Sequence, residues 1–404
     1  MPLTTEEIHA ARLRIAGGIV MTPCVPALAF AHLVPGRLCM KLEAFQRTGA
    51  FKERGALNRL LQLAPEERAR GVVTASAGNH AQALAYHAAR LGIPATVVMP
   101  ATTPLIKVTN TRHHGARVTL SGATVSDAME EAKKIEADEG LTMVHPFDDD
   151  AIIAGQGTIG LELLDQEPDL TTVIVPVGGG GLISGIAVAL KEARPNVRVI
   201  GVEAAAAPGA RDSLQAGHVV PIETAETIAD GIAVKRIGER TFPLIRRYVD
   251  DIVVVDEEQI AGAVHLLLER QKVVAEGAGA VPLAALLAGL VPLGSSDVTV
   301  MVVSGGNIDV NIIERIIDRG LVADGRLARL LVKVKDRPGV LAHLTEILAA
   351  SGANILELAH HRAFADISVG EVEIVIELET RGRDHVEEIL AHLAADGIEA
   401  RLMA

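Results

Sequence analysis

The sequence contains very few aromatic residues and cysteines. Phe, Trp and Tyr make up 2% of its 404 residues, and tryptophan is absent. The hydrophobic fraction is nevertheless 49%, so Ala, Val, Leu and Ile must form the cores. The two cysteines, Cys24 and Cys39, have neither the number nor the spacing of a disulfide framework or a zinc site. Both are expected to be reduced and structural, as in a cytoplasmic protein.

Positive charge is also scarce. Lysine and arginine together number 38 against 51 acidic residues, which gives a formal net charge of −13. This balance offers no electrostatic attraction for nucleic acid or an anionic membrane, so we predict neither as a partner. The opening stretch, MPLTTEEIHAARLRIAGG, lacks the basic and apolar regions of a signal peptide.

One long stretch without charge, residues 277–296, is a candidate for a membrane span. Its glycine-rich start and its two prolines, Pro282 and Pro292, favour a buried core helix instead. We therefore expect no membrane-spanning segment.

A length of 404 residues exceeds one ordinary domain, so two or three are expected. Apolar, β-branched runs alternate with stretches of helical pattern, which predicts a parallel sheet covered by helices on both faces. Ligands bind beyond the carboxyl ends of such strands, so chemistry is expected in the loops that follow them. The expected strands lie at residues 71–77, 94–100, 116–122, 171–178, 197–204, 251–257 and 298–306.

The pattern changes near residues 318–330, where a short polar connection is expected. The segment after it predicts strands and helices in the order βαββαβ, which is a small ferredoxin-like domain. We therefore divide the chain into residues 1–320 and 327–404.

The run VPVGGGGLISG follows an expected strand and opens an expected helix. Gly178, Gly179, Gly180 and Gly181 carry no side chains, so backbone amides can converge on an anion at the helix N-terminus. In no register do these glycines fit the dinucleotide fingerprint, and no Gly-Lys-Ser/Thr follows for a nucleoside triphosphate. A phosphate monoester fits better, and the alternative is a tight turn that binds nothing.

Two other loops after expected strands carry short polar residues. TASAGNHAQA places Ser76 and Asn79 where a helix starts, and VVSGGN leaves Ser304 at the end of its strand. The alternatives are an N-cap for the first loop and an ordinary turn serine for the second.

Lys52, in TGAFKERGAL, follows two small residues and Phe51. Desolvation beside such residues would lower the pKa of the amine and free it for Schiff-base chemistry. The alternative is a solvated surface charge.

Together, these signals predict a pyridoxal phosphate site, which needs a lysine, a phosphate cradle, an asparagine and a serine. The motifs FQRTGAFKERGAL, SAGNHAQALAY, GGGGLISG and VVSGGN, in this order, resemble those of the threonine dehydratases (threonine ammonia-lyases) of the tryptophan-synthase-like fold. The resemblance covers residues 45–307. It implies an α/β, two-lobed parallel-sheet enzyme (tryptophan synthase β-like, fold type II) in residues 1–320, with a smaller lobe at about 40–150.

The resemblance also implies roles for individual residues. Lys52 would bind pyridoxal 5'-phosphate as a Schiff base and act as the catalytic base, with Phe51 near the cofactor ring. Ser304 would face the pyridine nitrogen and Asn79 the ring hydroxyl. The residues for the phosphate would be Gly178, Gly179, Gly180, Gly181 and Leu182, and those for the substrate carboxylate Ser76, Ala77, Gly78, Asn79 and His80.

Residues 327–404 resemble an ACT domain, the small amino-acid-sensing module of ferredoxin-like βαββαβ type. The turn from Asp336 to Gly339, between its first strand and first helix, is the expected regulatory site. An effector amino acid, isoleucine or valine, is expected there. Because a domain this small has exposed sheet edges, a homo-oligomer (dimer or tetramer) is expected too. The alternative is a domain that only joins subunits.

For an amino-acid substrate, the resemblance implies conversion of L-threonine to 2-oxobutanoate and ammonia, a first step towards isoleucine, and of L-serine to pyruvate. Ser304 favours this outcome, because a hydroxyl does not hold a proton on the pyridine nitrogen and loss of the β-substituent then competes well. The alternatives are a serine dehydratase or racemase, and a catabolic threonine dehydratase without isoleucine control. Racemisation is expected to be poor, because Ala77 stands where the family's racemases place a second serine.

No metal site is predicted. The adjacent pairs His113–His114 and His360–His361 would have diverging side chains. Glu203 matches a position that ligates a cation in some relatives, but Gly209 stands near where a later acidic ligand would fall.

Overall fold

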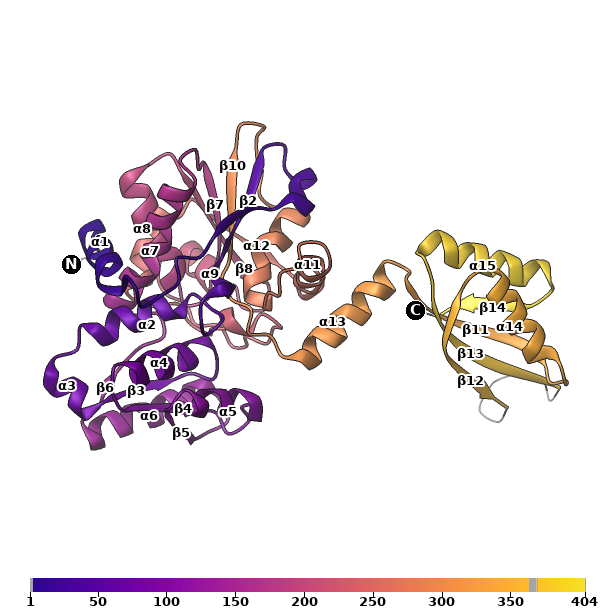
Figure 1. Cartoon of the computed structure of the whole chain (residues 1–404), viewed down its shortest axis with the longest axis horizontal. Helices are drawn as coiled ribbons and strands as arrows, with labels where there is room; N and C mark the ends of the chain where they lie inside the picture. The colour runs from indigo at the N-terminus through magenta and orange to yellow at the C-terminus, as the bar shows by residue number, and fades with distance from the viewer. Residues whose placement is uncertain (1–2, 363–367, 369, 404) are drawn as a thin grey trace. The chain divides into compact units, whose positions relative to one another are not determined.

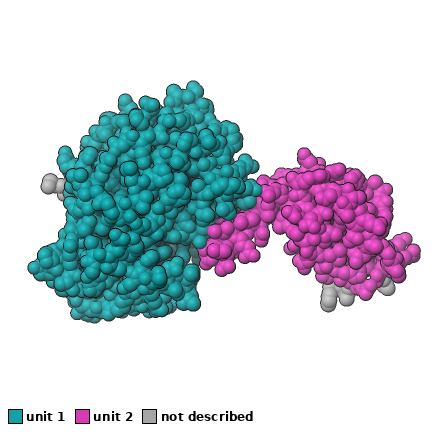
Figure 2. All heavy atoms as spheres, in the orientation of Figure 1, with its two compact units in different colours: residues 1–308 teal, residues 309–404 magenta. Residues whose placement is uncertain are grey.

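The computed structural model describes residues 3–362, 368 and 370–403. The chain forms two compact units, residues 1–308 and 309–404, coloured teal and magenta in Figure 2. This division groups residues 309–320 with the C-terminal unit, whereas the sequence analysis placed them in the catalytic part.

The first unit contains two sheets, as the resemblance implies, whereas the alternation of strands and helices alone predicted a single parallel sheet. The larger has six strands in the order β1-β2-β10-β7-β8-β9, with β1 antiparallel to β2 and the other pairs parallel. Its strands are β1 (Cys24–Pro26), β2 (Arg37–Leu42), β7 (Thr172–Pro176), β8 (Arg198–Ala204), β9 (Asp251–Val255) and β10 (Val298–Val303).

The smaller sheet is parallel throughout, in the order β5-β4-β3-β6. Each of the seven expected runs contains a strand of one sheet or the other, so the two-lobed parallel-sheet fold is confirmed. The strands of the smaller sheet are β3 (Val72–Ala75), β4 (Ala95–Met99), β5 (Arg117–Leu120) and β6 (Thr142–Met143).

Helices lie on both sides of the larger sheet. Figure 1 shows α7 (Asp150–Gln166) and α8 (Gly181–Ala193) on one side, and α11 (Glu257–Glu269) and α12 (Gly277–Leu287) on the other. The first ten residues of α12 are buried, so the expected core helix in residues 277–296 is confirmed. Within the described part of the chain, no helix is long and apolar enough to cross a membrane.

The remaining helices of the first unit are shorter or belong mainly to the smaller lobe. They are α1 (Thr5–Ile15), η1 (Leu28–Leu33), η2 (Glu43–Phe45), α2 (Lys52–Leu61), α3 (Pro65–Arg70), α4 (Asn79–Arg90), α5 (Leu105–His113), α6 (Val125–Glu139), α9 (Gly209–Ala216), η3 (Asp230–Ile232) and α10 (Thr241–Tyr248).

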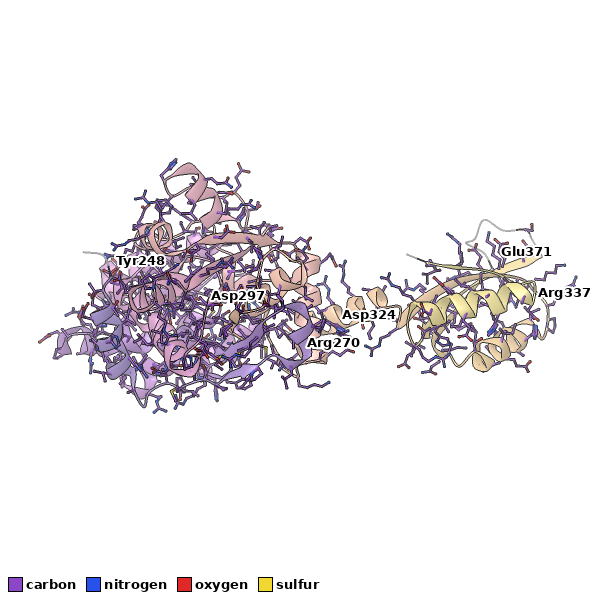
Figure 3. All side chains as sticks on the ribbon, turned by 90° about the horizontal axis from the view of Figure 1, so that it is seen from above. Tyr248, Arg270, Asp297, Asp324, Arg337 and Glu371 are labelled. Carbon is purple, nitrogen blue, oxygen red and sulfur yellow. The ribbon has the colours of Figure 1, made fainter. Side chains whose placement is uncertain are left out.

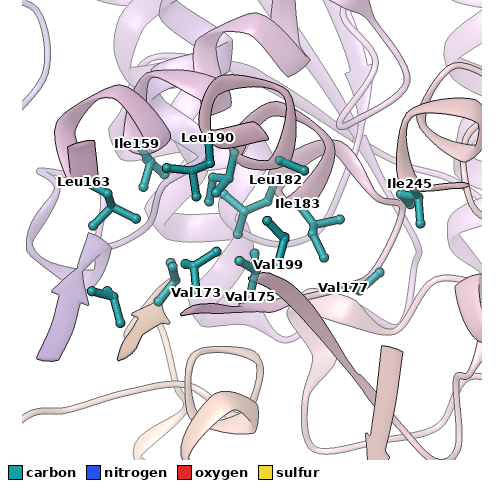
Figure 4. Close-up of a cluster of buried hydrophobic side chains, with 14 of the residues drawn as sticks. Ile159, Leu163, Val173, Val175, Val177, Leu182, Ile183, Leu190, Val199 and Ile245 are labelled. Atoms are coloured by element: carbon teal, nitrogen blue, oxygen red, sulfur yellow. The ribbon is translucent and has the colours of Figure 1, made fainter. Parts of the chain in front are cut away.

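The main hydrophobic core of the first unit lies between β7 and the helices α7 and α8 (Figure 4). Val173 and Val175 of β7 belong to the same buried cluster as Ile183 and Leu190 of α8. Burial of each such aliphatic side chain stabilises the folded state by roughly 1.5–3 kcal/mol. This core therefore fixes the end of β7 against the start of α8, and with it the glycine-rich loop between them.

The second unit has the predicted βαββαβ order after its first helix. Its antiparallel sheet has the strand order β12-β13-β11-β14, and the buried side chains of both later helices pack against it. The elements are α13 (Val310–Ala323), β11 (Leu327–Lys335), α14 (Val340–Ala350), β12 (Asn354–His361), β13 (Glu371–Glu379), α15 (Arg383–Ala395) and β14 (Glu399–Leu402).

The polar connection expected at residues 318–330 is wrong for most of that segment. The helix α13 continues to Ala323 and β11 begins at Leu327, so residues 324–326 alone connect them. Isoleucine and valine side chains recur at helical spacing through α13, and this pattern outweighs the cost of about 1 kcal/mol for a glycine inside a helix.

Candidate active site

Lys52 is the first residue of α2, and its side chain points into the protein. Its Nζ donates a hydrogen bond of 2.7 Å to the backbone oxygen of Pro146, and it lies 5.1 Å from the ring centroid of Phe51. Burial lowers the pKa of Lys52 from 10.5 to about 8, while the nearby Glu276 acts in the opposite direction. The interpretation of Lys52 as a solvated surface charge is therefore wrong.

A buried group of four charges anchors α2 just after Lys52. Arg54 donates from Nε and Nη2 to the carboxylate of Glu43, both at 2.8 Å, and from Nη1 to Glu162 at 2.6 Å. Lys41, on the strand β2, forms a further ion pair with Glu162 of α7. Burial would raise the pKa of Glu43, but the ion pair and hydrogen bonds with Arg54 hold it below its ordinary value. Two cations thus compensate two carboxylates inside the core.

The Lys52 loop lies against the loop that follows β10. Phe51 N–H donates to the backbone oxygen of Ser304 at 3.0 Å, and Gly306 N–H donates to the oxygen of Gly49 at 2.9 Å. Ser304 is buried at the carboxyl end of its strand. The structure therefore brings together Lys52 and Ser304, which are far apart in the sequence.

Asn79 begins α4, and both ends of its side-chain amide are hydrogen-bonded. Its Nδ2 donates to Glu276 Oε1 at 2.7 Å, and its Oδ1 accepts from Asn307 Nδ2 at 2.8 Å. Asn307 Nδ2 also donates to the oxygen of Thr48, beside the Lys52 loop, at 2.6 Å. Asn79, Lys52 and Ser304 thus lie around one site.

The N-cap interpretation of this loop is wrong. Gly78 occupies the N-cap position of α4, and no side chain caps the helix there. Ser76 Oγ accepts from Gly78 N–H at 3.3 Å, outside the helix. A Cβ added at Gly78 would meet no atom within 4 Å, so the loop borders open space beside the half-buried Ala77.

His80 is buried behind the loop. Its Nε2 donates to the backbone oxygen of Val144 at 3.1 Å, because a carbonyl oxygen only accepts. Among the described residues its Nδ1 has no hydrogen-bond partner. Burial, and then the charge of Lys52, lowers the pKa of His80 to about 3, so the ring is neutral.

The glycine loop runs from the end of β7 into α8. Gly180 has φ +91°, a left-handed conformation that favours glycine. A Cβ at Gly179 would collide with the ring of Phe147, and one at Gly178 would lie 2.9 Å from Ile232. Gly181 opens α8, so its amide and the next ones have no acceptor within the helix. These amides suit a phosphate group.

The segment between β6 and α7 connects the parts of this site, and the sequence analysis missed it. The oxygen of Val144 accepts from His80, the oxygen of Pro146 accepts from Lys52, and Phe147 packs on Gly179. The β6 strand has two residues, too few for a recognisable strand pattern. The signal that could have found the segment is the alternation of strands and helices, which calls for a strand between α6 and α7.

Comparison with known proteins agrees with this arrangement. Residues 15–305 match the family model described as pyridoxal-phosphate dependent enzyme, and residues 328–394 match the ACT domain. The chain belongs to the pyridoxal-phosphate-dependent enzyme family. The cofactor fits the residues present, since Lys52, with its lowered pKa, bonds to Pro146, and the next residue, Phe147, lies against Gly179 of the loop that opens α8.

Individual relatives extend the comparison over the whole chain. The chain is 48% identical to an L-threonine ammonia-lyase of Thermotoga maritima over 99% of this chain and 100% of the relative. It is 52% identical to an L-threonine ammonia-lyase of Geobacter sulfurreducens over 96% of this chain and 97% of the relative. The structure of maize serine racemase matches with a TM-score of 0.75 and 36% identity, over 80% of this chain and 99% of that one.

Glu203, the weak metal candidate, binds backbone in this structure. Its two carboxylate oxygens accept from the N–H groups of Ala210 at 2.7 Å and Arg211 at 2.9 Å, at the start of α9. Burial raises the pKa of Glu203 to about 7. The carboxylate therefore satisfies amides of a helix N-terminus.

The expected regulatory turn lies at one end of the sheet of the second unit. Asp336 accepts two hydrogen bonds from Arg362, at 2.9 and 3.2 Å, and Gly339 has φ +90° directly before α14. A cavity of about 650 Å³ lies elsewhere in this unit, beside Asp324 and Arg383. Figure 3 shows Asp324 at the end of the sheet opposite to Arg337 and Glu371.

Proposed function

We propose that the chain is a threonine ammonia-lyase that converts L-threonine to 2-oxobutanoate and ammonia, and L-serine to pyruvate and ammonia. The observation that carries the proposal is Lys52, with a pKa lowered to about 8, hydrogen-bonded to Pro146 beside Ser304 and the glycine loop. The two relatives named as L-threonine ammonia-lyases, similar over almost the full chain, support threonine as substrate.

The residues divide the work of holding the cofactor. Lys52 would hold it covalently, the amides from Gly178 to Leu182 its phosphate, Ser304 its pyridine nitrogen, and Asn79 its ring oxygen. Pyridoxal phosphate bound there supplies the electron sink that stabilises negative charge on the substrate α-carbon.

Lys52 is also the proposed general base for the α-proton. Near neutral pH, a useful fraction of an amine with a pKa of about 8 is in the neutral form, which is still basic enough to take a proton. The loop from Ser76 to His80 would hold the substrate carboxylate at the open side of the site. Ser304 lacks the negative charge that would keep the pyridine nitrogen protonated, which favours loss of the β-hydroxyl over transamination.

The test is 2-oxo acid formation from threonine and from serine by the purified protein. We expect both substrates to react, and Lys52→Ala to lose at least about a thousandfold in rate, because it lacks both the covalent anchor and the base. A Lys52→Ala variant with a near-normal rate would exclude this mechanism.

A serine racemase is the second candidate, supported by the similarity to the maize enzyme. Ala77 argues against it, since a methyl group cannot deliver a proton to the opposite face of the substrate. Chiral analysis of L-serine left after long incubation decides between the two. Substantial D-serine would favour the racemase.

We also propose that the ACT domain binds a branched-chain amino acid, with isoleucine as inhibitor and valine as antagonist, in a homo-oligomer. The turn from Asp336 to Gly339, held by Arg362 before the first amides of α14, is the proposed site for the effector carboxylate. Equilibrium dialysis with isoleucine and valine tests binding. Light scattering tests whether the protein is a dimer or tetramer.

A further inference from the structure

Glu276 is a buried carboxylate at the lysine site that the sequence pattern did not reveal. It precedes α12 and is 3% exposed. Its Oε1 accepts from Asn79 Nδ2 at 2.7 Å, and the backbone N–H of Asn307 also donates to the carboxylate. Burial, and then the charge of Asp230, raises the pKa of Glu276 to about 7, so these hydrogen bonds compensate an otherwise unfavourable charge.

Glycines on two loops leave space for this carboxylate. A Cβ at Gly305 would lie 2.5 Å from Glu276 Oε1, and one at Gly231 would lie 3.1 Å from it. Glu276 N–H also donates to the oxygen of Gly305 at 3.1 Å. Backbone and side chain of Glu276 are therefore both fixed next to the loop of Ser304.

The chemistry of the neighbours determines how the Asn79 amide is oriented. A carboxylate oxygen accepts, so the Asn79 atom facing Glu276 must be the NH₂ group. Asn307 Nδ2 donates, so the atom facing it must be the Asn79 oxygen. Both contacts select the same one of the two amide orientations, and they leave one N–H of Asn79 without a role in this network.

We propose that Glu276 is a positioning residue that orients the Asn79 amide and makes its second N–H available to the ring oxygen of pyridoxal phosphate. This inference rests on the proposed function, because it assumes that Asn79 serves the cofactor. Lys52 Nζ donates to the oxygen of Pro146, and Glu276 influences that amine only through its charge. The hydrogen bond to Asn79 Nδ2 is therefore the contact through which Glu276 would position a group for the cofactor.

The test measures pyridoxal phosphate binding by the full-length apo-protein, through the visible absorbance of the bound cofactor. Glu276→Ala is expected to bind about tenfold more weakly than the wild type, which corresponds to about 1.4 kcal/mol. Asn79→Ala is expected to show a similar loss. The double variant should bind no more weakly than Asn79→Ala alone, because Glu276 then has no amide to orient.

A second readout separates positioning from a general loss of stability. Glu276→Ala and Asn79→Ala should shift the visible band of the cofactor in the same direction. Glu203→Ala is the matched control, because Glu203 is also buried with a raised pKa and also accepts two N–H groups. It should lower the melting temperature of the apo-protein while leaving cofactor affinity and the visible band unchanged.

The outcomes are distinct. Unchanged cofactor affinity in Glu276→Ala, or a further tenfold loss when it is added to Asn79→Ala, would overturn the positioning role. If Glu276→Ala does not fold, Glu276→Gln replaces it, and its uncharged amide oxygen, a weaker acceptor for Asn79 than a carboxylate, should weaken binding severalfold. Wild-type protein that binds no pyridoxal phosphate would instead refute the proposed function.

Discussion

Lys52 shows how its place in the fold changes the chemistry of one residue. With a pKa of about 8, roughly one amine in ten is neutral at pH 7, against fewer than about one in a thousand for an ordinary lysine. The cause is burial, because water no longer stabilises the ammonium form.

This difference predicts how the apo-protein takes up its cofactor. Because the neutral amine is the form that attacks an aldehyde, the rate of pyridoxal phosphate uptake should rise with pH and level off above about pH 8. Stopped-flow absorbance across this range measures it, with Lys52→Ala as the control that forms no covalent link. A rate that keeps rising towards pH 10 would contradict the lowered pKa.

Local motifs predict single site residues only where the expected chemistry lies within one loop. Lys52, Asn79 and Ser304 each stand in a short motif after or near a strand, and the structure brings them together. Glu276 contacts Asn79 across 197 positions, and nothing in its own surroundings, AEGAG, indicates a partner. Such partners are defined only by the fold.

Among the elements, α2 depends on the buried charges of Arg54, Glu43 and Glu162. Arg54→Met should lower the free energy of unfolding by about 3–5 kcal/mol, because it leaves a buried carboxylate without its partner. Lys133→Ala is the matched control at an exposed ion pair with Glu130, where less than about 1 kcal/mol is expected. Urea unfolding of the apo-proteins compares them, and equal losses would contradict the role of the buried group.

The elements themselves were largely predictable, and the exceptions have physical reasons. Continuous β-branched runs predicted the buried parallel strands, because such strands are apolar on both faces. Three strands were missed: β1 and β6, because three and two residues carry no recognisable period, and β2, because Arg37 and Lys41 interrupt its apolar run. The polar connection at residues 318–330 was predicted too long, because its charged residues and Gly320 resemble a loop although α13 continues to Ala323.

For the whole molecule, two buried glutamates link stability to pH. The pKa of Glu203 and of Glu276 is raised from 4.5 to about 7, so between these values the folded chain binds protons that the unfolded chain has released. Their contribution to stability is therefore fully present below about pH 4.5 and is lost as the pH rises through about 7.

Glu203→Gln tests this linkage, because the amide does not titrate. Between about pH 5 and pH 8 the wild type should lose about 2–3 kcal/mol more of its free energy of unfolding than the variant does. Unfolding midpoints measured across this range give the two slopes. Equal slopes would mean that Glu203 is ionised throughout in the folded state.

Because the chain forms two compact units, truncation between them can test the proposed inhibition by isoleucine. Truncation after Ile308, where the first unit ends, removes α13 together with the whole βαββαβ unit. We expect the truncated protein to keep its turnover of threonine within about twofold and to lose its response to isoleucine. Isoleucine should lower the rate of threonine turnover by the full-length protein at least about fivefold, which is the lower end of ordinary coupling between two sites.

Asp336→Ala in the full chain separates the proposed effector turn from the rest of the unit. The substitution removes the partner of Arg362, so the turn before α14 should hold isoleucine less well, and a higher concentration should be needed for half-maximal inhibition. Rates measured over a series of isoleucine concentrations give this value for both proteins. Because an effector acts only by preferring one state of the protein, unchanged inhibition in the truncated chain would place the effector site in the first unit.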